Sequence, residues 1–122
     1  MKPSGRRTAA QAAGGAAEEA AARFLAARGL QLIARNYRTR MGEIDLVARE
    51  GETLVFVEVR RRSSARFGGA AESVDARKRM RIASAARHFL ARLQREPACR
   101  FDVVTLEGDG VSEWLRGAFE TA

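Results

Sequence analysis

The sequence predicts an α/β domain in which a mixed β-sheet is covered by helices. Its length, 122 residues, is that of one ordinary domain. Short β-rich apolar runs alternate with two longer segments whose apolar residues recur at helical spacing. Hydrophobic residues make up 46% of the chain and charged residues 30%, which are globular proportions and argue against a disordered or fibrous protein.

The N-terminal half is predicted to hold one helix and three strands. Residues 1–14 have no periodic apolar pattern and are expected to form a disordered basic tail, so that the single domain spans residues 15–122. Residues 16–28 are strong helix formers that end at Gly29. The strands are predicted at residues 30–37, 42–48 and 53–60.

The C-terminal half is predicted to hold a second helix and at least one strand. Residues 61–70 are polar and rich in glycine, which is typical of a loop. A long helix is expected at residues 73–93, and Pro97 follows its end. Residues 99–106 form a further strand, and residues 111–119 are either helical or strand-like. The resulting order of elements is α-β-β-β-α-β.

The second and third strands are joined by a short link containing Gly51, which predicts an antiparallel hairpin. A symmetric hairpin centred on the Glu-Gly dipeptide of this link would place Asp45 opposite Phe56. Glu43 would then face Glu58. Asp45 and Glu58 would lie diagonally on one face with Cα atoms about 7–8 Å apart, close enough for both carboxylates to hold one small ion.

Two acids on one partly buried face repel each other and need a cation to stay ionised. A hard divalent ion such as Mg²⁺ accepts one or two carboxylates together with waters and a substrate phosphate, and it can promote phosphodiester hydrolysis. Glu18 lies on the helix stripe that faces the sheet and is a candidate third acid. The residues alone leave two alternatives open, namely ion pairs between Asp45 or Glu58 and arginines, and a helix-dipole role for Glu18.

The charge balance suggests a polyanionic partner. The chain has 22 basic and 15 acidic residues, a net charge of +7 and a pI near 11.1. Nucleic acid is the leading candidate, and simple solvation of the surface is the alternative. No apolar run reaches the roughly 18 residues of a membrane-spanning helix. A single cysteine, Cys99, suits a reducing compartment, so a cytoplasmic location is expected.

Several other residues are predicted to be structural. His88 has no cysteine or histidine at zinc-binding spacing and is expected to be a surface residue. Asp102 is expected to pair with an arginine, and Trp114 and Phe119 to fill the edge of the core. The chain has no Walker-type phosphate loop, so ATP is not expected to be a substrate.

Five short motifs, taken in order, resemble the bacterial YraN family. They are R-N-Y at 35–37, G-E-I-D at 42–45, F-V-E-V-R at 56–60, R-F-G-G at 66–69 and R-F-D-V-V at 100–104. That family consists of predicted endonuclease-like proteins grouped with the restriction-endonuclease-like fold and related to archaeal Holliday-junction resolvases. The resemblance covers the chain from about residue 16 to residue 119.

The resemblance implies a PD-(D/E)xK active site that uses Mg²⁺ or Mn²⁺. Asp45 matches the aspartate of the first half of this pattern, and Glu58 matches the acid of the second half. Glu18 matches the helix glutamate. Glu43 matches an acid that either touches the metal shell or pairs with an arginine. Arg60 stands where the family pattern has lysine. Arginine cannot act as a base, although it can clamp a phosphate.

Nucleic-acid contacts are expected from basic residues and glycines around this site. Lys78 matches a family lysine and is the best candidate for a contact with a backbone phosphate. Ala17, which directly precedes the helix glutamate Glu18, departs from the family, where a glycine is usual at this position. Further phosphate contacts are expected in the loop after the third strand, from Arg61, Arg62 and Arg66 and from the backbone N–H groups of Gly68 and Gly69.

The expected function is a metal-dependent endodeoxyribonuclease that acts on branched, flapped or single-stranded DNA. A four-way junction is two-fold symmetric and would favour a homodimer. Two alternatives remain. The first is a nucleic-acid-binding module of the same fold that has lost catalysis, with Arg60 as the cause. The second is an adaptor that binds an acidic protein partner.

Overall fold

A computed structural model describes residues 9–62 and 74–120 and confirms the predicted α/β class. The elements are α1 (Ala9–Ala27), β1 (Gln31–Arg38), β2 (Glu43–Glu50), β3 (Thr53–Arg61), α2 (Ala76–Leu90), β4 (Cys99–Glu107) and β5 (Gly110–Phe119). The five strands form one mixed sheet in the order β1-β2-β3-β4-β5. Strands β3 and β4 are parallel and the other neighbours are antiparallel. This arrangement is compatible with a restriction-endonuclease-like core.

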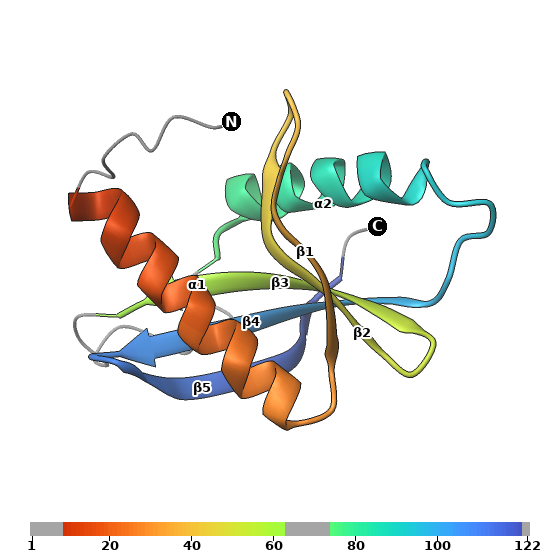
Figure 1. The fold of residues 1–122 in the computed structure, drawn as a ribbon. Helices are drawn as coiled ribbons and strands as arrows, with labels where there is room; N and C mark the ends of the chain where they lie inside the picture. The colour runs from red at the N-terminus through yellow and green to blue at the C-terminus, as the bar shows by residue number, and fades with distance from the viewer. Residues whose placement is uncertain (1–8, 63–73, 121–122) are drawn as a thin grey trace, which may run out of the picture.

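The two helices cover opposite faces of the sheet (Figure 1). Helix α1 packs alanines and Leu25 against Leu46, Val55 and Val57. Helix α2 connects the parallel pair β3 and β4, and it packs against the other face. The buried residues of that second layer include Ile44, Val47, Phe56, Ile82, Phe89 and Val103. The sheet is therefore buried on both sides, as its apolar strands require.

Both helices differ in length from the prediction. Helix α1 begins at Ala9 rather than at residue 16. The predicted tail thus overlaps the helix at residues 9–14, while residues 1–8 lie outside the described part of the chain. The alanines in this stretch favour helix strongly enough to outweigh Gly14 and the adjacent Gly15. Helix α2 spans Ala76–Leu90 instead of residues 73–93, because Asp75 caps it by accepting a hydrogen bond from the Lys78 backbone N–H at 2.9 Å.

The predicted register of the β2–β3 hairpin is wrong by two residues. Phe56 lies opposite Val47 rather than Asp45. The reason is that β2 continues to Glu50, which pairs with Thr53. The turn therefore contains only two residues, and its centre lies one residue later than predicted. A shift of two residues preserves the face on which each side chain lies. It therefore brings Asp45 level with Glu58 instead of diagonal to it, and Glu43 does not face Glu58.

Strands β1 and β2 form a long hairpin that projects past α2 (Figure 1). Its turn, residues 39–42, is held by the Thr39 side chain, whose Oγ1 accepts hydrogen bonds from the N–H groups of Met41 and Gly42 at 3.1 Å. The Thr39 N–H also donates to the Gly42 carbonyl at 2.8 Å. Gly42 is buried against the backbone of Arg81 in α2, where a Cβ atom would lie 2.0 Å from the Arg81 carbonyl oxygen. This glycine lets the hairpin touch the helix.

We expect Gly42→Ala to destabilise the protein by about 2 kcal/mol or more, because the hairpin must move away from α2 to admit a methyl group. Urea denaturation measures the effect. Gly110→Ala is the matched control, since its Cβ atom would have no neighbour within 4 Å. Equal stabilities of the two variants would contradict the close approach.

Candidate active site

The candidate site lies where β2 and β3 separate. The pair Leu46 and Val57 is the last one in the β2–β3 ladder, and Asp45 and Glu58 are the next residues on the two strands. Their carboxyl groups are hydrogen-bonded to each other. Asp45 also accepts a hydrogen bond from the Val59 backbone N–H at 2.8 Å. The backbone thus fixes Asp45 beside Glu58, with both carboxyl groups on one small patch.

Burial makes this pair of acids reluctant to ionise. The Glu58 side chain is only 5% exposed. Desolvation, followed by the charge of Asp45, raises the pKa of Glu58 to about 8. Desolvation also raises the pKa of Asp45, against the opposing effect of the hydrogen bond from Val59. Near neutral pH the pair therefore holds a proton that a cation can displace.

Two cationic side chains approach Glu58. Arg60 Nη1 and Lys78 Nζ each lie 3.6 Å from Glu58 Oε2. Arg60 shares the strand face of Glu58, because the two residues are separated by one position in β3. Lys78 comes from the first turn of α2, whose position is set by the Asp75 cap. The sequence predicts a phosphate contact for Lys78 but not its position beside Glu58.

Glu18 reaches the same region from α1. Its pKa is raised, first by desolvation and then by the charge of Asp45. The Glu18 side chain is hydrogen-bonded to Asn36, which lies in β1 with φ of 52°. Asparagine tolerates this left-handed conformation better than most residues do. The sequence motifs predict no role for Asn36, although an asparagine inside an otherwise regular strand pattern is a usable signal.

The remaining predicted residues divide into two groups. Glu43 forms an ion pair with Arg38 at 3.7 Å, which is one of the two alternatives stated for it. Arg61 donates to the Gly108 carbonyl at 2.5 Å, and Arg62 lies 3.9 Å from Glu113, so both contact the β4–β5 hairpin. Their contacts with nucleic acid stay a prediction. Arg66, Gly68 and Gly69 lie outside the described residues.

Most of the chain, including the candidate site, matches a known protein family. A family model described as "Uncharacterised protein family UPF0102" matches residues 17–106. The chain belongs to family UPF0102. This confirms the resemblance to YraN proteins, which are members of that family. The matched range includes Glu18, Asp45, Glu58 and Lys78.

Relatives in UPF0102 are similar over nearly their whole length. The chain is 57% identical to a UPF0102 protein of Albidiferax ferrireducens, with 88% of this chain and 87% of the relative covered. It is 54% identical to one of Paracidovorax citrulli, with 94% and 87% covered. For one of Nitrosospira multiformis the identity is 51%, with 88% and 92% covered. The names of these relatives give the family and no activity, so the chemistry has to be inferred from the site.

The donor set of this UPF0102 site fits a hard divalent cation. Asp45 and Glu58 supply carboxylate oxygens, and their mutual repulsion when ionised is what such an ion relieves. Residues 15–62 and 74–120 contain no group of three or more acidic, histidine or cysteine side chains close enough to hold a metal. Glu18 is thus a neighbour of the pair rather than a member of a preformed three-ligand cluster. Two carboxylates suffice for Mg²⁺, which retains several waters.

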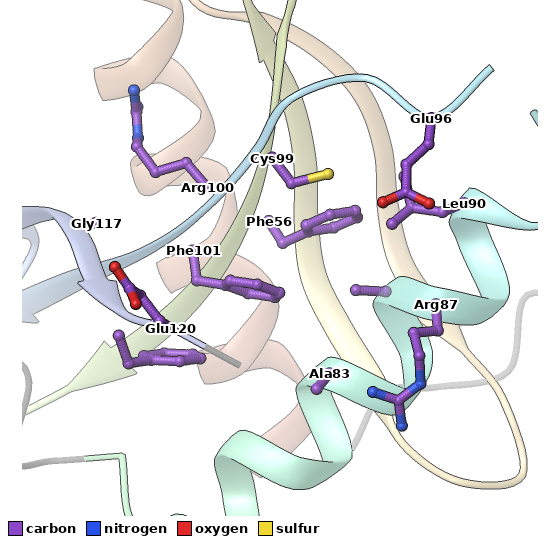
Figure 2. A pocket seen from close by; sticks show the side chains of 12 residues that line it. Phe56, Ala83, Arg87, Leu90, Glu96, Cys99, Arg100, Phe101, Gly117 and Glu120 are labelled. Atoms are coloured by element: carbon purple, nitrogen blue, oxygen red, sulfur yellow. The ribbon is translucent and has the colours of Figure 1, made fainter. Parts of the chain in front are cut away.

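A separate hollow lies between α2 and the start of β4 (Figure 2). Phe56, Phe101 and Phe119 form a stack beneath it, with ring centroids 5.4 and 5.2 Å apart. Among the described residues that line it, the acids are Glu96 and Glu120, which lie on opposite sides of the hollow (Figure 2). It therefore offers no paired carboxylates, and the candidate chemistry stays at the separation of β2 and β3.

Three residues predicted to be structural have structural contacts. His88 is exposed, and its Nδ1 lies 2.5 Å from the Tyr37 hydroxyl. Trp114 packs edge-on against Phe24 of α1, and Phe119 is buried. No helix in the described ranges has the length and apolar character needed to cross a membrane.

Asp102 is fully buried at the centre of a polar network. It accepts two hydrogen bonds from the Arg100 guanidinium, at 2.8 and 2.9 Å. The Trp114 indole N–H and the Gly117 N–H donate to it at 2.9 and 3.0 Å. Arg100 in turn contacts Glu50 at 2.7 Å. The expected pairing of Asp102 with an arginine is confirmed.

The raised pKa of Glu58 predicts how Glu58→Gln changes stability with pH. In the unfolded chain the carboxyl ionises near its ordinary pKa of 4.5, whereas in the folded metal-free protein it stays protonated up to about 8. The wild type therefore loses free energy of unfolding as pH rises between these values, and glutamine does not titrate. We expect the variant to gain on the order of 2 kcal/mol relative to wild type between pH 5 and pH 8.

Denaturation in EDTA at both pH values measures this gain. Glu107→Gln, which removes an exposed carboxyl at the end of β4, is the control and should show no such pH-dependent difference. A stability difference between Glu58→Gln and wild type that is independent of pH would contradict the raised pKa.

Proposed function

We propose that this UPF0102 protein is a metal-dependent endonuclease that acts on branched or otherwise irregular DNA. One observation carries the proposal. Two hydrogen-bonded carboxyl groups lie together on neighbouring strands, the buried Glu58 and the half-buried Asp45, and two cationic side chains approach Glu58. Acids that burial keeps reluctant to ionise, with positive groups placed beside them, are the components expected at a site that binds a divalent ion and a phosphate together.

The two carboxyl groups would hold the metal. Asp45 is fixed by the Val59 N–H, and Glu58 would give up its proton when the ion binds. When bound, Mg²⁺ or Mn²⁺ supplies polarisation of the phosphate and a lower pKa for water. Glu18, which is hydrogen-bonded to Asn36, would orient solvent on the α1 side of the pair.

The two cations would bind the substrate. Arg60 and Lys78 are at equal distance from one Glu58 oxygen, so a phosphate that approaches the pair would meet both of them. Arg60 stays protonated at any working pH and would steady the phosphate and the charge that develops on it. The net charge of +7 would attract the DNA backbone to the protein. The preference for irregular DNA rests on the resemblance to resolvases.

The test is one assay of the purified protein. Duplex, single-stranded, flap and four-way DNA are each incubated with Mg²⁺, with Mn²⁺ and with EDTA. We expect cleavage that needs the metal, is strongest on the irregular substrates, is absent in Asp45→Asn and increases in Arg60→Lys. Equal background nicking by all three proteins would overturn the proposal.

Binding separates the two alternatives. DNA affinity that falls steeply with salt, without any cleavage, would instead identify a binding module in which Arg60 has ended catalysis. A protein that binds no DNA at low salt would point to the adaptor with an acidic protein partner.

A further inference from the structure

The tip of the β1–β2 hairpin combines rigidity with exposure. Its backbone is closed by the Thr39 hydrogen bonds, and Gly42 is pressed against the α2 backbone at Arg81. Arg40 and Met41 occupy the two corner positions of this turn and are both exposed. Met41 is 67% exposed, which is unusual for a large apolar side chain. The turn therefore holds the side chains of Arg40 and Met41 in solvent at a fixed position relative to the rest of the protein.

The surroundings of this tip favour a polyanion. Arg38 is exposed next to it and lies 3.7 Å from the partly exposed Glu43, a solvent-screened pair that a phosphate can displace. A shallow hollow between the hairpin and α2 is lined by Arg38, Arg40, Met41, Ser84 and His88. Among the residues that the structure describes, no acid lines that hollow. An apolar side chain flanked by arginines suits a duplex end or junction, because the arginines can contact phosphates while the apolar group packs on an exposed base.

The tip is also close to the candidate site along the chain. Met41 precedes Asp45 by four residues, which span at most about 14 Å of extended backbone. Successive nucleotides of one strand are about 3.4 Å apart, so this distance corresponds to about four nucleotides. A side chain that marks a discontinuity in DNA would thus lie within a few nucleotides of a phosphate at the carboxyl pair.

We propose that the turn at residues 39–42 is a wedge, in which Met41 packs against the unstacked base at a branch point while Arg38 and Arg40 bind the adjacent phosphates. This proposal rests on the proposed DNA-binding function and names the element that would recognise irregular DNA. It does not require that the protein cut its substrate.

The test uses Asp45→Asn as the background, in EDTA, so that binding is measured without cleavage. The probes are a three-way junction with 2-aminopurine at the branch point and a continuous duplex with the same label. We expect binding to raise the 2-aminopurine fluorescence of the junction and not that of the duplex. Met41→Ala should abolish the rise and lower the ratio of junction to duplex affinity by about fivefold to tenfold.

Two further variants make the test specific. Met80→Ala removes a methionine of α2 that is 71% exposed and lies outside the hairpin, and it should behave as the background protein does. Arg40→Gln should weaken binding to both DNAs and reduce the salt dependence by about one phosphate contact.

An unchanged affinity ratio in Met41→Ala, or a junction whose fluorescence does not change when protein binds, would overturn the wedge while leaving DNA binding intact. Failure to bind either DNA would overturn the proposed function and the wedge with it. Binding with a wedge signal but no cleavage by the wild type would reject only the endonuclease.

Discussion

Asp45→Asn is expected to reduce metal-dependent DNA cleavage by about a thousandfold or more. Asparagine keeps an oxygen that can accept the Val59 N–H but removes the charge that would bind the ion. The fold should survive, because the substitution removes the charge of a half-buried carboxylate whose pKa is already raised by desolvation. Single-turnover cleavage rates, combined with melting temperature in EDTA, separate catalysis from stability.

The matched control for this prediction is Glu43→Gln. Glu43 lies on the same strand and pairs with Arg38 rather than with Glu58, so its loss should have a much smaller effect on rate. If Asp45→Asn cleaved as fast as wild type, the carboxyl pair would not be the metal site. An equal loss of cleavage rate in both variants would instead mean that the total negative charge of β2 matters, and not the position of Asp45.

Asp102→Ala is expected to destabilise the protein by about 3–5 kcal/mol. The substitution removes a fully buried carboxylate that accepts four hydrogen bonds, and it leaves the Arg100 guanidinium and the Trp114 indole without that partner. Such a loss would lower the melting temperature of a domain of this size by well over 10 °C, since about 1 kcal/mol shifts it by several degrees.

Urea denaturation followed by Trp114 fluorescence and by circular dichroism would report the loss. Glu113→Ala, which removes an exposed acid of β5, serves as the control and should change stability only slightly. A small effect of Asp102→Ala would mean that the network contributes little beyond what water could supply.

The sequence predicts the strands and the shared face of the two acids well, because a period of two residues is a local property. The same property explains why the wrong hairpin register was harmless to the site. A shift of two residues moves Asp45 along the face without turning it away. The choice between a two-residue turn and a longer link depends on how Gly51, with φ of 60°, closes the hairpin, and composition alone does not decide this.

The approach of Lys78 to Glu58 could not be predicted from the sequence. The two residues are twenty positions apart, and their contact depends on where α2 begins and how it crosses the sheet. The cap at Asp75 places Lys78 in the first turn, but only tertiary packing directs that turn towards β3. The hydrogen bond between Asn36 and Glu18 is similar, since it joins β1 to α1 through an unusual backbone conformation.

The irregular outer strands of the sheet limit how two copies could associate. Strand β1 has a register shift between Leu32 and Ala34 and a positive φ at Asn36, and exposed Arg35 and Arg38 interrupt it. Strand β5, at the other border, has two register shifts and a positive φ at Gly117. Neither border offers the long, flat, uncharged template that joins two sheets into one continuous ribbon. If a four-way junction recruits two subunits, they should meet through helices or loops, and the chain gains protection from strand-mediated aggregation.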